Sequence, residues 1–143
     1  MIGMEILKPV IVLAGWTMVM WLWMYITRLP AMSAAKIDSK TLVGGTGQTL
    51  DAVLPAKTQW IAHNYNHLHE APTVFYAVAL VLAMIGQGDG FNASIAWAYV
   101  GLRIVHSLVQ VLSNRVIVRF GIFVLSSLAL MMLVAHAAMA LFQ

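Results

Sequence analysis

The sequence predicts an all-α integral membrane protein, folded as one four-helix transmembrane bundle over residues 1–143. Two observations indicate this class. Hydrophobic residues make up 62% of the chain and charged residues only 9%, whereas soluble domains carry about a quarter charged residues. Four apolar stretches each approach or exceed the roughly 20 helical residues that cross a bilayer. One domain fits the length, because a domain typically takes about 150 residues.

The four predicted helices differ in the charges that they contain. The first, at about 9–27, and the fourth, at about 120–142, contain none. The second, at about 58–85, contains Glu70, and the third, at about 93–112, contains Arg103. A charge within a membrane helix is costly and usually finds a partner in the bundle interior. We therefore expect an ion pair between Glu70 and Arg103.

The basic residues of the connections predict the orientation of the bundle. Lys and Arg residues concentrate in the connection at about 28–57 and at the turn between the third and fourth helices. By the positive-inside rule these two connections face the cytoplasm. We expect a multi-pass protein of the bacterial inner membrane. The basic residues in question are Arg28, Lys36, Lys40, Lys57, Arg115 and Arg119.

Several other functions find little support in the composition. The net charge of +3 is spread along the chain without a dense basic segment, which argues against nucleic acid as a partner. The chain has no cysteine, so it supplies neither a thiolate nucleophile nor a Cys-ligated metal centre. A glycine-rich run at residues 44–47 lacks the following Lys-Ser/Thr of a phosphate-binding loop.

Polar residues form a stripe on each of the two middle helices. On the second helix the spacing puts His63, Asn66, His67 and Glu70 on one face. The third helix aligns polar side chains in the same way, with arginines at the basic end beyond it. We expect these residues to surround a polar cavity open to the end with the basic connections. A buried pair such as Glu70 and Arg103 can also serve only to fix helix packing. The polar residues of the third helix and the arginines beyond it are Arg103, His106, Ser107, Gln110, Arg115 and Arg119.

These residues resemble a known family. Arg103, His106, Gln110, Arg115 and Arg119 follow the spacing of the prostaglandin E synthase branch of the membrane-associated proteins in eicosanoid and glutathione metabolism (MAPEG), in which the position of Gln110 is a Tyr. Glu70, followed by Pro72 and Phe75, adds to the resemblance.

The resemblance implies a homotrimer that binds glutathione as co-substrate between neighbouring subunits near the cytoplasmic face. Arg119 would be the catalytic cation that favours the glutathione thiolate. The remaining candidate binding residues are Arg115, Arg103, His106, Gln110, Glu70, His67, Asn66 and His63.

Three functions follow from this pattern. The first is a glutathione-dependent transferase or peroxidase that acts on lipophilic electrophiles or lipid hydroperoxides. The alternative is a non-catalytic lipid-binding or scaffold protein of the same fold, favoured by His63, His67 and Gln110, which replace residues typical of the family. In either case the partners would be further copies of the chain, lipids and lipophilic small molecules. A metal site built from His63, His67, Glu70 and His106 ranks last, because Glu70 would also have to balance Arg103.

Overall fold

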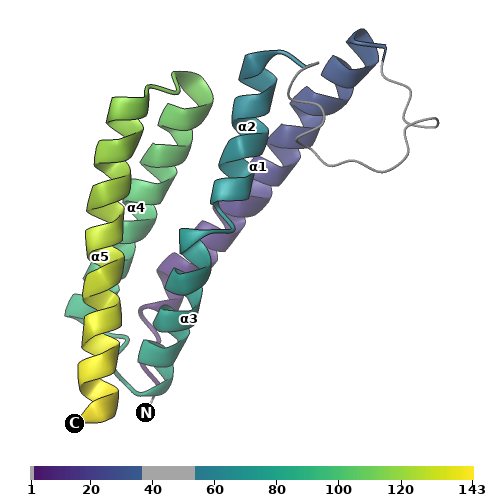
Figure 1. The fold of residues 1–143 in the computed structure, drawn as a ribbon. Helices are drawn as coiled ribbons and strands as arrows, with labels where there is room; N and C mark the ends of the chain where they lie inside the picture. The colour runs from purple at the N-terminus through teal and green to yellow at the C-terminus, as the bar shows by residue number, and fades with distance from the viewer. Residues whose placement is uncertain (1, 37–53) are drawn as a thin grey trace.

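The computed structural model describes residues 2–36 and 54–143 and contains only helices there (Figure 1). The order of elements is α1 (Leu7–Ala34), α2 (Ala56–His67), α3 (Ala71–Met84), α4 (Phe91–Leu112) and α5 (Val116–Phe142). Taken together, α2 and α3 form one span, so the described residues provide four helical segments long and apolar enough to cross a membrane. The predicted all-α, four-span class is confirmed.

The second span is broken, which corrects the expectation of one continuous helix at about 58–85. Helix α2 ends at His67, and α3 begins at Ala71. Pro72 lies in the first turn of α3. A proline has no N–H to donate and its ring clashes with the carbonyl four residues earlier, here that of Leu68. The helix therefore stops and restarts around Glu70, which precedes α3 with a non-helical backbone.

Helix α4 is the central element of the bundle. It packs most extensively against α5 and also contacts α1 and α2. Half of its most apolar stretch is buried, against 22% for α1 and 17% for α5. The stacked rings of Phe75 and Tyr99, with centroids 4.6 Å apart, join α3 to α4. The outer faces of α1 and α5 expose large apolar side chains, as expected for helices surrounded by lipid.

The bundle has two distinct ends (Figure 1). At the terminal end, residues 2–6 lie against the connection at 86–90. The Gly3 N–H donates to the Ala83 carbonyl at 2.8 Å and the Ile6 N–H donates to the Gly88 carbonyl at 2.9 Å. The basic end holds the end of α1, the start of α2 and the turn from α4 to α5. Lys40 and the glycine-rich run lie outside the described residues, and the side of the membrane that each end faces stays a prediction.

Candidate functional site

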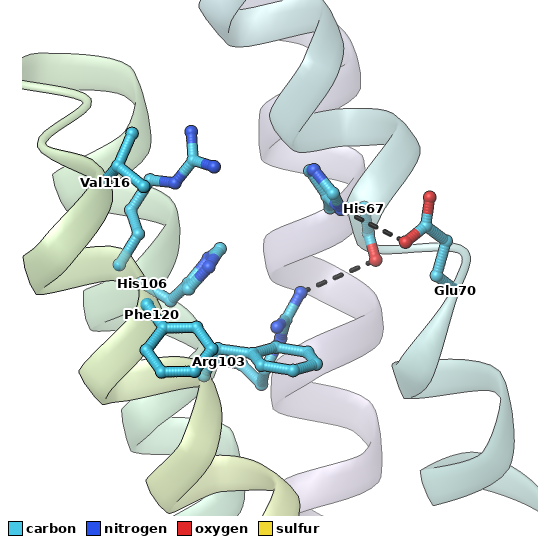
Figure 2. A pocket seen from close by; sticks show the side chains of 8 residues that line it. His67, Glu70, Arg103, His106, Val116 and Phe120 are labelled. Atoms are coloured by element: carbon cyan, nitrogen blue, oxygen red, sulfur yellow. Dashed lines mark hydrogen bonds and ion pairs between the residues drawn. The ribbon is translucent and has the colours of Figure 1, made fainter.

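A polar cavity of about 270 Å³ lies between the junction of α2 and α3, helix α4 and helix α5. Figure 2 shows side chains from both sides converging on it. The lining contains two arginines and one glutamate, together with two histidines and three apolar side chains. The lining residues are His67, Glu70, Arg103, His106, Val116, Arg119, Phe120 and Phe123.

Arg103 is the most deeply buried charge of the cavity. Only 2% of the residue is exposed. Its Nη2 donates a long hydrogen bond of 3.5 Å to the carbonyl of His67, one of the carbonyls at the C-terminus of α2, where a cation interacts favourably with the helix dipole. Its Nε has no hydrogen-bond partner. Arg103 is thus a buried cation that lines the cavity and has an incomplete set of hydrogen bonds.

Glu70 does not form the predicted ion pair with Arg103. Its Oε2 lies 3.1 Å from Nδ1 of His67, three residues earlier, and its side chain is 67% exposed. The reason is the break in the second span. A continuous helix would have placed Glu70 one turn below His67 on the inner face, whereas the turn before α3 leaves this side chain at the rim of the cavity (Figure 2). Arg103 meets the His67 carbonyl instead.

Two histidines from different helices face each other across the cavity. The ring centroids of His67 on α2 and His106 on α4 are 6.4 Å apart in an edge-to-face arrangement. His106 is buried, and its Nδ1 has no hydrogen-bond partner. A neutral imidazole has one donor and one acceptor nitrogen, so His106 adds a polar group to the lining of the cavity.

Arg119 extends from the first turn of α5, where Asn114 holds it. The Arg119 Nη1 donates to the Asn114 Oδ1, while the Arg119 Nε has no partner. Asn114 occupies the turn between α4 and α5 with a φ of 51°, a left-handed conformation that asparagine tolerates better than most residues. Asn114 was not predicted as a site residue from the sequence, although an asparagine just after a predicted helix is a signal for this conformation.

The structure gathers five of the nine predicted site residues in the cavity: His67, Glu70, Arg103, His106 and Arg119. The other four lie elsewhere. Asn66 and Arg115 are exposed, His63 is partly buried, and Gln110 is buried. None of these four lines the cavity, and their predicted role in binding stays a prediction.

The apolar wall of the cavity and the buried Asn64 were also not predicted from the sequence. Val116, Phe120 and Phe123 form the apolar wall, and their spacing of four and three residues, with Arg119 one turn after Val116, would have indicated a shared helix face. Asn64 is fully buried on α2, and neither polar atom of its side-chain amide has a partner. The buried face of α2 therefore differs from the predicted one, because Asn64 is buried and Asn66 is exposed.

The metal hypothesis gains no support. Within residues 2–36 and 54–143, no three His, Asp or Glu side chains come together in a group able to hold a metal ion. Glu70 and His67 lie close to each other, but a third ligand is lacking in this part of the chain.

The fold and the cavity define a class of protein, a four-span helical membrane bundle with a cationic, partly apolar cavity within it. A family model described as the MAPEG family matches residues 6–139. The match covers nearly the whole chain, and the chain belongs to the MAPEG family. It is thus a membrane protein of a family associated with glutathione and eicosanoid metabolism. Comparisons with curated proteins and with solved structures give no significant match, and closeness to the prostaglandin E synthase branch stays a prediction.

Proposed function

We propose that the protein is a glutathione-dependent transferase or peroxidase that acts on lipophilic electrophiles or lipid hydroperoxides. One observation carries this proposal. The same cavity is lined by the guanidinium groups of two arginines and by a wall of Val116, Phe120 and Phe123. It therefore offers a site for an anion beside a site for an apolar molecule.

The arginines fit the anionic groups of glutathione. Arg103 and Arg119 both line the cavity, and guanidinium groups bind carboxylates with a planar pair of donors. A cation near a thiol also lowers the thiol pKa from its usual value of about 8.5. Arg119 is the proposed cation for the thiolate, while Arg103 and His106 would orient the peptide. Both reactions of the proposal begin from this thiolate.

The apolar wall fits a lipophilic acceptor. Val116 is 70% exposed and Phe120 is 62% exposed, so the wall is continuous with the apolar surface of α5. In a bilayer this surface contacts lipid. An apolar electrophile can reach the cavity from the membrane, while a polar thiol enters from water.

The size of the cavity favours a site shared between subunits. Its volume of about 270 Å³ lies slightly below the roughly 300–1,000 Å³ of typical ligand pockets. A tripeptide would extend beyond it. We propose that a neighbouring copy in a homotrimer completes the site and covers exposed polar groups such as the Glu70 carboxylate.

The test compares arginine variants in detergent-purified protein. We expect Arg119→Ala to abolish thioether formation with an apolar electrophile, and Arg119→Lys to retain a fraction, because lysine keeps the charge but loses the planar fork. Lys57→Ala is the control, since Lys57 is an exposed cation at the same end and lies outside the cavity. Rates would be measured across pH 6 to 9, where a change in the thiol pKa shifts the rate profile.

The lipid-binding or scaffold function is the second candidate, and the position of Gln110 favours it. Gln110 stands where the prostaglandin E synthase branch has a Tyr. It is buried and does not line the cavity. Calorimetric titration with glutathione separates the two functions. If the wild type neither binds glutathione nor shows conjugation or peroxidase activity, the enzyme proposal is wrong and the scaffold function takes its place.

A further inference from the structure

A second polar cavity lies at the terminal end of the bundle, away from the arginines. Its volume is about 530 Å³, and it lies between the start of α4 and the last turns of α5. The residues that matter here are Asp89, Phe91, Asn92, His136, Met139 and Ala140. No residue is shared with the cationic cavity, so the two can be tested separately.

Two linked hydrogen bonds determine which ring nitrogen of His136 carries the proton. The Asn92 Nδ2 donates to the backbone carbonyl of Gln87 at 2.8 Å, which determines that the Asn92 Oδ1 is the atom facing His136. The His136 Nδ1 lies 2.6 Å from this Oδ1 and must carry the proton, since an amide oxygen only accepts. In the neutral ring Nε2 is then an acceptor, and no protein partner for it is seen among the described residues.

Asp89 supplies a second acceptor, and the fold holds it in place. Its Oδ1 accepts a hydrogen bond from the Glu5 backbone N–H at 3.1 Å. The segment that contains Glu5 is itself fixed to the connection between α3 and α4, because Gly3 and Gly88 approach so closely that a Cβ on Gly88 would lie 2.4 Å from the Gly3 oxygen. The carboxylate is therefore positioned before any ligand arrives.

The charge of the lining selects a cation with N–H donors. Asp89 has the only acidic side chain among the described lining residues, and no Lys or Arg is present there to offset it. Phe91 is 66% exposed, with its ring centroid 5.9 Å from that of His136, and an aromatic face attracts a cation. The N-terminus of α4 opposes a cation, but only with about half an elementary charge, which is less than the charge of Asp89.

We propose that this cavity binds a primary ammonium group, with Asp89 and His136 as its hydrogen-bond acceptors. An ammonium group has three donors, which suits two acceptors and leaves one for water. A quaternary ammonium carries the same charge but has no N–H. A primary ammonium group can come from the head group of a lipid or from a free amine. The acyl chains of such a lipid would lie along the apolar side of α5, next to Met139 and Ala140.

The experiment uses the delipidated full-length protein and a series of lipids that differ only in head-group methylation. Native mass spectrometry would measure the binding of phosphatidylethanolamine, of its mono- and dimethylated forms, and of phosphatidylcholine. We expect affinity to fall at least fivefold across the series, because each methyl group removes one donor. Competition with millimolar free ethanolamine distinguishes the sources: displacement by ethanolamine assigns the site to the amine alone, and its failure assigns the site to the lipid.

Variants connect the preference to the cavity. Asp89→Asn and His136→Phe should each reduce the preference for phosphatidylethanolamine to less than twofold, whereas Ser94→Ala, at the same end but outside the lining, should retain it. Should a variant not fold, ¹⁵N-histidine spectra of the wild type replace it, with a shift of the His136 Nε2 signal expected on addition of phosphatidylethanolamine but not of phosphatidylcholine. Equal binding of the two lipids, or a preference that survives Asp89→Asn, would overturn the proposal.

Discussion

Removing the Glu70 charge should change the stability of the ligand-free protein only slightly. Glu70 and its partner His67 have side chains 67% and 43% exposed, three residues apart. Exposed ion pairs contribute about 0 to 1 kcal/mol. At about 2 to 4 °C per kcal/mol for a chain of this size, Glu70→Gln should lower the melting temperature by less than about 4 °C. A buried pair that loses one partner would instead cost about 3 to 5 kcal/mol.

Arg103→Met should be close to neutral or stabilising in the same measurement. The change removes a buried charge that has an unpartnered Nε and makes only one long hydrogen bond of 3.5 Å. Replacing buried charge by apolar groups of similar volume is often neutral or stabilising. Glu70 and Arg103 make no direct contact and are linked only through His67, so the coupling between the two changes should stay below about 1 kcal/mol.

The assay is thermal unfolding in detergent, followed by tryptophan fluorescence, for the two single variants and the double variant. Glu5→Gln is the matched control, since Glu5 forms a 3.1 Å pair with Lys8 at the same three-residue spacing and with similar exposure. A loss of more than about 6 °C in Glu70→Gln that Arg103→Met restores would contradict the separation of the two side chains and establish a direct ion pair.

Three further predictions test other parts of the molecule. Asn114→Gly keeps the left-handed conformation but removes the acceptor for Arg119, so calorimetry should show weaker glutathione binding at an unchanged melting temperature; unchanged affinity would mean that Asn114 does not position Arg119. Gly88→Ala should cost about 1 to 3 kcal/mol in unfolding experiments, because its Cβ would clash with backbone at 2.4 Å, whereas Gly121→Ala, with nothing within 4 Å, should gain up to about 1 kcal/mol. A cysteine at Ser39 should resist impermeant thiol reagents outside intact cells, and ready labelling there would reverse the predicted orientation.

The sequence contains the signal for the break in the second span, but the length of the apolar run predicts a single helix there. Pro72 is visible in the sequence, and a proline within a helical pattern indicates that the helix ends or kinks before it. The apolar run nevertheless predicted one helix, and on that helix Glu70 pointed inward. Apolar length sets where a chain crosses a membrane, but it does not set the direction of each polar side chain.

Composition and segment length are enough to predict the class of this protein, because the energetics of lipid insertion depend on both. Four apolar segments were sufficient to predict the membrane bundle, and the spacing from Arg103 to Arg119 was sufficient to predict the family. The tertiary structure alone decided which polar residues meet. It placed Val116, Phe120 and Phe123 beside the arginines, and it joined Asn92 to His136 across 44 residues of chain. Such contacts depend on how each helix is rotated and where it is interrupted, and packing against its neighbours fixes both.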